Sequence, residues 1–270
     1  MKLFVSHFDQ RLFENYLIDY KDKDFSLFVD YKPQKTEDFS SENIFVAQEP
    51  NEYFGNHDWI IENKSNFSLI LTWSSKILNN CDNAVFLTNG TYWFDFDLLK
   101  NERNKTFSVA HLTGKLKQTY GHLMRHEIYD RQNEIKIPKN FYQTFGDRFD
   151  LYNAIRDKEI IFGNQMFGIG IENTSHEGYF SDKITDSILF KTIPIYWGCS
   201  NIGDFYDKRG IITFQNADEL IKICNNLTPD YYFDRLDVIN ANYLRAISYR
   251  NYEERICTTI KNYLNNSNQI

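Results

Sequence analysis

Short runs of apolar residues alternate with polar stretches along most of the chain. Runs of this length are typical of strands buried in a parallel sheet. We expect strands at residues 2–8, 43–49, 68–73, 83–88, 106–112, 166–172, 192–198 and 210–214. Helical spacing of apolar residues predicts helices at 119–133, 182–191 and 217–227, and one or two long helices between 229 and 264. The polar stretch between the first two strands is interpreted as helix and loop.

Strands that alternate with helices in this way predict an α/β fold with parallel sheet. The order fits two compact Rossmann-like halves that face each other across a cleft. The charged, weakly periodic segment 95–106 is interpreted as a linker between them. We therefore expect one domain over residues 1–100, a second over 101–245 and a C-terminal helix over 246–270.

The amino-acid composition argues against several classes of function. The chain has 270 residues, a net charge of −7 and 17% aromatic residues. A protein without basic excess is not expected to bind nucleic acid in general. The four cysteines are scattered and form no CxxC pair, so we expect buried thiols rather than disulfides or metal ligands.

The N-terminal residues carry no targeting signal. The first apolar run is broken by His7 and Asp9, and no stretch approaches the ~20 apolar residues of a membrane span. We expect no transmembrane anchor and a cytoplasmic protein of microbial or viral origin.

The segment 171–198 carries the clearest chemical signal. A predicted strand ends at Glu172 and Asn173, and Ser181 or Asp182 can cap the helix that follows. Lys183 in the first helical turn is unfavourable for the helix unless an anion binds there. Carboxylate and amide oxygens can also accept hydrogen bonds from ribose or base hydroxyls. From spacing alone, a solvated first turn with an incidental lysine is the alternative.

This segment resembles the donor-site signature of the inverting α1,3/4-fucosyltransferases. That signature runs E-N-S, G-Y-V-T-E-K-I, a helix and T-I-P-I-Y-W-G. The matching positions are Glu172, Asn173, Gly178, Tyr179, Lys183, Ile184 and the whole run 192–198. The chain departs from the family where Ser181 and Asp182 replace Thr and Glu, and the shorter aspartate shortens the reach of that carboxylate.

Two further matches lie upstream. The family has a helix with R-x-x-F-Y-D, whose arginine contacts the diphosphate, and Arg125 holds that place in this chain. The alternative is an exposed arginine that pairs with a nearby acid. The family's general base follows a strand of the first domain, and the resemblance assigns that role to Glu49, with Glu52 and Glu62 as substitutes.

The resemblance implies a compact GT-B-like glycosyltransferase. Its donor is expected to be GDP-fucose or another nucleotide sugar, and its acceptor a saccharide bound on the side of the first domain. Arg125 and Lys183 would neutralise the departing diphosphate, and Glu172, Asn173, Tyr179 and Asp182 would bind the donor. Transfer would proceed with inversion and need neither a metal ion nor a cofactor. The acceptor, the linkage and the oligomeric state are not indicated.

Two alternatives stay open. Asp95 and Asp97 form a DxD triplet, which in a metal-dependent transferase holds a cation against a UDP-sugar, for example in galactosyl transfer. A catalytically silent relative that only binds glycans is the second.

Other patterns are weaker. His122 and His126 are spaced like a metal pair but lack a third ligand, and we interpret them as surface or packing residues. Gly168 and Gly170 lack the context of a dinucleotide fingerprint. The aromatic run 92–94 is interpreted as core.

Overall fold

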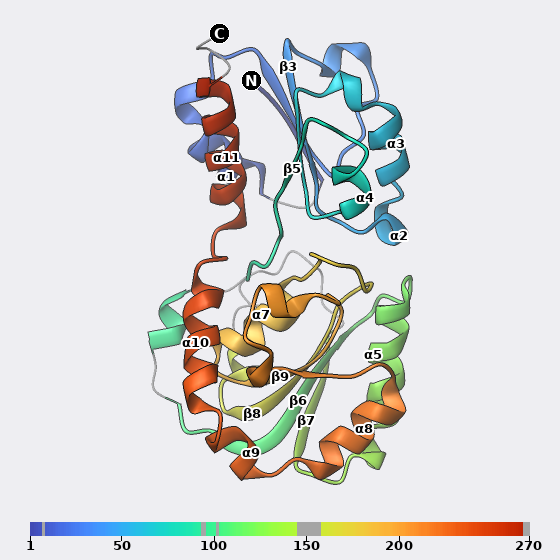
Figure 1. Cartoon of the computed structure of the whole chain (residues 1–270), viewed down its shortest axis with the longest axis vertical. Helices are drawn as coiled ribbons and strands as arrows, with labels where there is room; N and C mark the ends of the chain where they lie inside the picture. The colour runs from blue at the N-terminus through green and yellow to red at the C-terminus, as the bar shows by residue number, and fades with distance from the viewer. Residues whose placement is uncertain (7–8, 93–95, 101–102, 145–157, 267–270) are drawn as a thin grey trace. The chain divides into compact units, whose positions relative to one another are not determined.

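The chain folds into two compact α/β units. The computed structural model describes residues 1–6, 9–92, 96–100, 103–144 and 158–266. One unit comprises Met1–Asn89 and Asn251–Ile270, and the other comprises Gly90–Arg250. Each unit is built on a five-stranded parallel sheet (Figure 1). This confirms the expectation of two Rossmann-like halves.

The first sheet keeps the order of the sequence. Its strands run in the order β1-β2-β3-β4-β5, and every neighbouring pair is parallel. The bounds are β1 Lys2–Val5, β2 Phe25–Val29, β3 Glu42–Ala47, β4 Leu69–Thr72 and β5 Ala84–Phe86. Parallel strands end at one common edge, so the residues that follow β2 and β3 become neighbours there.

Successive residues of the strands pack alternately into two buried clusters, one on each face of this sheet. Leu27 and Val29 pack toward helices α1 and α11, whereas Phe28 packs in the other cluster. Figure 1 shows α1 and α11 on one face and α3 and α4 on the other. The helices are α1 Gln10–Tyr16, α2 Asn51–Phe54, α3 His57–Glu62, α4 Ser75–Leu78 and α11 Tyr252–Asn266, with short 3₁₀ helices at Ile18–Tyr20, Thr36–Asp38 and Lys64–Asn66.

The second sheet reverses its order once. Its strands run β10-β9-β8-β6-β7, all parallel. The chain goes from β6 outward to β7 and then returns to the other side of β6 with β8. Such a reversal is a topological switch point, where α/β proteins bind ligands beyond the carboxyl ends of the strands. The bounds are β6 Thr106–Gly114, β7 Lys139–Thr144, β8 Gln165–Ile171, β9 Ile193–Trp197 and β10 Ile212–Thr213.

Helices cover both faces of the second sheet as well. Figure 1 shows α5 and α8 on one face and α7 and α10 on the other. Each face has its own buried cluster. The helices are α5 Tyr120–Asp130, α7 Asp182–Leu189, α8 Ala217–Asn226, α9 Pro229–Phe233 and α10 Leu236–Ile247, with 3₁₀ turns at Phe96–Lys100, Gln132–Glu134, Ile202–Asp204 and Lys208–Gly210.

Two strands were not predicted. β2 lies in the segment interpreted as helix and loop, and β7 lies in a polar stretch after α5. The five residues of β2 are all buried, but the polar residues around them give the segment no clear period. The long C-terminal helices predicted over 229–264 are three helices, α9, α10 and α11.

The boundary between the units also differs from the predicted linker. From Gly90 onward the chain is bound to the second unit, because the Gly90 N–H donates to the Phe180 carbonyl at 3.0 Å and the Gly90 carbonyl accepts from the Thr185 hydroxyl at 2.8 Å. The unit border therefore lies between residues 89 and 90, before the predicted position between 100 and 101. α11, predicted within a separate C-terminal helix over 246–270, belongs to the first unit.

Two sequence expectations can be checked directly. All four cysteines are buried free thiols, as expected. In the described part of the chain, no helix has the length and apolar character needed to cross a membrane.

Candidate functional site

Arg125 lies at the switch point of the second sheet. It belongs to α5, which follows β6, and its side chain reaches the loop that follows β8. Its Nε donates to the Ile171 carbonyl at 2.9 Å, and its Nη2 donates to Asn173 Oδ1 at 2.8 Å. Among the described residues, no acceptor binds the third guanidinium nitrogen, Nη1. Two nitrogens of the guanidinium, Nε and Nη2, thus bind the protein, and Nη1 can bind a ligand.

Glu172 links the end of β8 to the start of α7. Its side chain is fully buried and accepts hydrogen bonds from the Ser181 N–H at 2.9 Å and the Ser181 hydroxyl at 2.6 Å. The Tyr196 hydroxyl donates to the same carboxylate at 3.3 Å. Burial raises the pKa of Glu172, although the nearby charge of Lys183 and the bonds from Ser181 oppose this. Glu172 therefore holds the first turn of α7 in place, and its carboxylate oxygens are engaged inside the protein.

Lys183 and Asp182 begin α7. Ser181 caps this helix, because its hydroxyl accepts from the Lys183 N–H. The ammonium of Lys183 lies 3.2 Å from the Ser181 hydroxyl and 3.1 Å from an Asp182 oxygen. The N–H groups of Lys183 and Ile184 are already bound to Ser181. The positive end of the helix dipole and the lysine charge thus meet at one place.

The two predicted cations lie at the same edge of the second sheet. Arg125 binds Ile171 and Asn173 at the end of β8, and Lys183 binds Ser181 and Asp182 at the start of α7. Burial lowers the pKa of Arg125, while the charges of Glu172, Tyr179 and Asp182 oppose the shift. Glu172 therefore interacts electrostatically with both Arg125 and Lys183. The buried Tyr179 belongs to the same group.

Lys158 completes this group and was not predicted. It lies in a short helical stretch, 158–162, and binds Asp182 at 3.2 Å and the fully buried Asp186 at 2.5 Å. Burial opposes the charge of Asp182, but Lys183 and Lys158 outweigh it and hold the pKa of that carboxyl far below its usual range. No motif marks Lys158, because its role depends on a contact that brings residues 24 and 28 positions apart together.

Glycines allow the backbone segments of the site to approach closely. A Cβ on Gly121, in the first turn of α5, would lie 1.8 Å from the Glu172 carbonyl. The Gly121 N–H instead donates to the Asn173 carbonyl at 3.1 Å. A Cβ on Gly198 would lie 2.3 Å from Cγ of Glu172. The Gly198 of the T-I-P-I-Y-W-G run therefore makes room for the buried carboxylate.

Glu49 lies in the first unit, where β3 ends. Its backbone N–H donates to both carboxylate oxygens of Asp30, at 3.3 and 3.2 Å, and its carbonyl lies 3.2 Å from His57 Nε2. Asp30 follows β2 and also accepts the Gln48 N–H at 3.0 Å. Both the backbone N–H and the carbonyl of Glu49 are therefore bound, and its half-buried side chain extends from this fixed backbone.

Asp30 is a second carboxyl group beside Glu49, and the sequence did not indicate it. It is buried and adopts a positive φ of 46°. Burial first, and then the charge of Glu49, raise the pKa of Asp30 to about 8. The substitutes proposed for the base, Glu52 and Glu62, lie exposed in α2 and α3.

Within the described residues, the weaker sequence patterns have structural explanations. Asp97 is exposed and pairs with Lys100 at 2.5 Å, while Asp95 lies outside the described residues. His122 caps α5, with Nδ1 2.8 Å from the Thr119 hydroxyl, and His126 Nε2 lies 3.2 Å from the Leu116 carbonyl.

The remaining two patterns belong to packing. Tyr92 packs against the buried cluster that contains Ile184 and Ile188 of α7. Trp93 and Phe94 lie outside the described residues. Gly168 and Gly170 lie in β8, where a Cβ would meet Ser187 Oγ at 2.9 Å and the Lys183 carbonyl at 2.4 Å, respectively. These two glycines let α7 pack closely on the sheet.

No protein-family model matches the sequence. Over 154 residues the chain is 30% identical to an α-(1,3)-fucosyltransferase, FucT, of Helicobacter pylori, a match that covers 53% of this chain and 31% of that protein. Over 105 residues it is 30% identical to an α-(1,4)-fucosyltransferase of Arabidopsis thaliana, with 35% of this chain and 26% of that protein covered. The matches thus span less than a third of the length of these relatives.

Solved structures resemble the chain over nearly its whole length. A crystal structure of an α1,3-fucosyltransferase matches with a TM-score of 0.54 and 16% identity, covering 92% of this chain and 88% of that one. A structure of an α1,3-fucosyltransferase with GDP-fucose gives 0.53 over the same shares, also at 16% identity. TarM of S. aureus, in complex with UDP and sugars, gives 0.52 at 12% identity, with 94% and 58% covered. The chain is therefore similar in sequence to an α1,3-fucosyltransferase over about half its length and to an α1,4-fucosyltransferase over about a third, and it has the fold of GT-B glycosyltransferases.

Proposed function

We propose that this protein is a glycosyltransferase that transfers fucose from GDP-fucose to a saccharide hydroxyl with inversion. The observation that carries the proposal is the pair of cations at the switch point, Arg125 on α5 and Lys183 at the start of α7. Sequence similarity to two fucosyltransferases supports fucose as the transferred sugar.

The second unit would bind the donor and stabilise the leaving group. Nη1 of Arg125 and the ammonium of Lys183 can bind diphosphate oxygens, and the positive end of the α7 dipole favours their negative charge. Charge that builds up on the diphosphate as the sugar leaves would then meet positive groups that are already in position. This arrangement supplies the electrostatic stabilisation that a metal ion supplies in other transferases, so we propose that no metal is required.

Donor selectivity would come from the polar groups around the cations. Asn173 is bound to Arg125, and Asp182 is bound to Lys158 and Lys183. Both side chains retain lone pairs for ribose or base groups, and Tyr179 offers a ring in the same group. Glu172 has a different role in this proposal, because its bonds to Ser181 and Tyr196 make it the support of α7.

Glu49 would act as the general base. The acceptor oxygen attacks the anomeric carbon of fucose and forms the new glycosidic bond, while the bond from that carbon to the β-phosphate oxygen breaks. GDP leaves with the electron pair, and the acceptor proton passes to the carboxylate of Glu49. The hydrogen bonds from the Glu49 backbone to Asp30 support this role, since a base must be held within reach of its proton.

Replacement of either cation tests the proposal. Arg125→Ala and Lys183→Ala should each lower turnover of GDP-fucose by roughly 10²–10³-fold or more, because each removes a charge from the diphosphate site. The exposed Lys136, whose ammonium binds the Asn133 carbonyl, provides a matched control. Lys136→Ala should retain wild-type turnover. Thermal unfolding and circular dichroism establish that the variants are folded.

Ligand and metal dependence separate this proposal from its alternatives. GDP, but not UDP, should raise the thermal midpoint, and transfer should continue in EDTA. Stabilisation by UDP together with strict dependence on Mn²⁺ would instead favour the transferase based on Asp95 and Asp97. If neither nucleotide bound and both alanine variants behaved like the wild type, the enzyme proposed here would be wrong.

A further inference from the structure

A groove of about 850 Å³ lies in the first unit, away from the edge that carries Asp30 and Glu49. Its base lies at Ser41, Asn43 and Ser68, where β3 and β4 begin. Asp30 and Glu49 follow the opposite, carboxyl ends of β2 and β3. The groove is therefore not part of the site described above.

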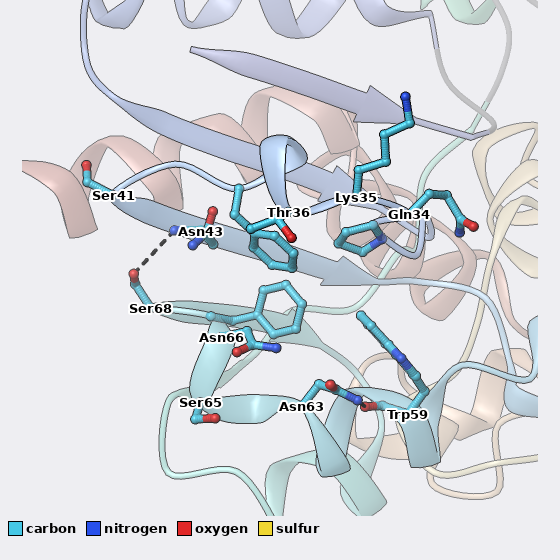
Figure 2. Close-up of a pocket in the computed structure, with 13 residues that line it drawn as sticks. Gln34, Lys35, Thr36, Ser41, Asn43, Trp59, Asn63, Ser65, Asn66 and Ser68 are labelled. Atoms are coloured by element: carbon cyan, nitrogen blue, oxygen red, sulfur yellow. Dashed lines mark hydrogen bonds between the residues drawn. The ribbon is translucent and has the colours of Figure 1, made fainter.

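Two segments form the banks of this groove. Figure 2 shows Gln34, Lys35 and Thr36 on one side and Trp59 with the 63–66 turn on the other. Such a volume lies within the range of small-ligand sites and exceeds what a single sugar ring needs.

Three aromatic rings lie along the groove between these banks. The Phe39 and Phe67 ring centroids are 6.3 Å apart, and those of Phe67 and Trp59 are 6.0 Å apart. Phe67 is buried, whereas Phe39 and Trp59 are half-buried and present part of each ring to the groove. A row of partly covered rings suits a ligand with a flat apolar side, such as the C–H face of a pyranose.

The polar groups on the banks are neutral amides and hydroxyls. Asn43 is already bound within the protein, because its amide bonds Ser40 on both sides. In contrast, the structure gives no protein partner, among the described residues, to the indole N–H of Trp59, the amide of Asn66 or the hydroxyls of Thr36 and Ser65. These are donors and acceptors of the kind that bind sugar hydroxyls.

The charges at the groove favour a neutral ligand over an anionic one. Among its lining residues, the cation is Lys35, which is exposed and lies 3.5 Å from Glu37. The ammonium of Lys32 lies 5.9 Å from the centre of the Trp59 ring and binds the Gly55 carbonyl at 3.0 Å. Both lysines are thus engaged within the protein, and among the described residues no arginine lines the groove to bind a phosphate or sulfate with two hydrogen bonds. Aromatic rings, neutral hydrogen-bonding groups and the volume of the groove together point to a neutral ligand with several ring units.

We propose that this groove binds a neutral oligosaccharide, with its pyranose faces on Trp59 and Phe39 and its hydroxyls on the 63–66 turn. The proposal goes beyond the transfer reaction, because it concerns a second carbohydrate site. Such a site would hold a glycan chain on the first unit whichever sugar the second unit transfers. Its test uses no donor, so its failure is distinguishable from failure of the proposed function.

The test is a titration of the full chain followed by NMR. The probes are neutral oligosaccharides of several linkages at millimolar concentration: β1,4- and β1,3-linked glucans, an α1,4-linked glucan and N-acetyllactosamine oligomers. We expect at least one to shift the indole signal of Trp59 and the amide signals of Asn63 and Asn66. The corresponding monosaccharides should shift them much less.

Variants then locate the binding. Ser65→Ala/Asn66→Ala removes two exposed bank groups that form no bonds within the described structure, and should weaken binding by about tenfold. Ser75→Ala/Asn79→Ala changes the same residue types at exposed positions outside the groove, at the start of α4 and directly after its end, and should bind like the wild type. Trp59→Phe serves to assign the indole signal.

Three results would overturn the proposal. One is that no oligosaccharide of the panel shifts the Trp59, Asn63 and Asn66 signals. Another is that the shifts occur only around Glu49. The third is equal loss of affinity in the groove variant and the α4 control.

Discussion

At the level of single residues, the first unit has an unusual carboxyl group in Asp30. This residue is buried, has a positive φ and binds the backbone N–H groups of Gln48 and Glu49. Burial and the charge of Glu49 raise its pKa from 3.8 to about 8. Asp30 therefore links the position of the proposed base to the pH dependence of folding.

The sign of that dependence follows from the direction of the shift. Because the folded-state pKa lies above the unfolded one, the folded state holds the extra proton between about pH 4 and about pH 8. The free energy of unfolding should thus fall as pH rises through this window. The side chain of the Asp30→Asn variant stays neutral at every pH. Between about pH 5 and about pH 8, the variant should therefore lose about 2–4 kcal/mol less stability than the wild type. Urea unfolding at the two pH values measures this.

A matched carboxyl group serves as the control. Asp58 is exposed, and its bond with Lys76 lowers its pKa, so Asp58→Asn should leave the slope in that window unchanged. If Asp30→Asn showed the same slope as the wild type, Asp30 would be ionised in the folded protein.

At the level of elements, the position of α7 depends on the glycines of β8. Gly168 and Gly170 lie on the same face of the strand, because side chains alternate along it. Their hydrogen atoms leave room for Ser187 and for the backbone of Lys183. The start of α7 is therefore set by backbone contact with the strand as well as by the Glu172–Ser181 bonds.

Gly170→Ala tests this contact. A Cβ 2.4 Å from the Lys183 carbonyl must displace the first turn of α7, so we expect a loss of about 1–3 kcal/mol in stability and weaker GDP binding. Gly114→Ala is the control, since its nearest neighbour would be Thr144 Oγ1 at an ordinary 3.9 Å. Thermal unfolding and GDP titration of both variants measure the effects. Equal behaviour of the two would show that α7 tolerates the displacement.

At the level of the whole molecule, the chain crosses into the second unit and returns. α11 completes the first unit, and Ile256, Cys257 and Ile260 pack with the strands of the first sheet in one buried cluster. The last helix in the sequence thus supports the first domain, while α9 and α10 belong to the second.

Ile260→Ala should therefore weaken the first unit selectively. Ile260 is fully buried, and its truncation should cost about 2–5 kcal/mol. Amide hydrogen exchange should report faster opening in segments of residues 1–89, while stabilisation of the second unit by GDP persists. Thr258→Ala, at an exposed position of the same helix, should change neither. Faster exchange spread evenly over both units would contradict this assignment of α11.

The sequence by itself determined the local part of this protein. Apolar runs such as 68–73 and 192–198 are long enough to specify buried strands, and the spacing from Glu172 to Lys183 specified a strand, a loop and a capped helix. These features depend on neighbours within a few residues, so their signal is contained in the sequence. The resemblance added the link between Arg125 and the same site.

Only the tertiary structure decided which distant residues share an environment. Lys158 next to Asp182, Asp30 next to Glu49 and α11 in the first unit all depend on how strands are ordered within a sheet. Sheet order leaves no periodic trace in the chain, because hydrogen bonds between strands join backbone atoms that every residue has. Strand β2 is a short apolar run among polar residues, and its place between β1 and β3 is visible only in the structure.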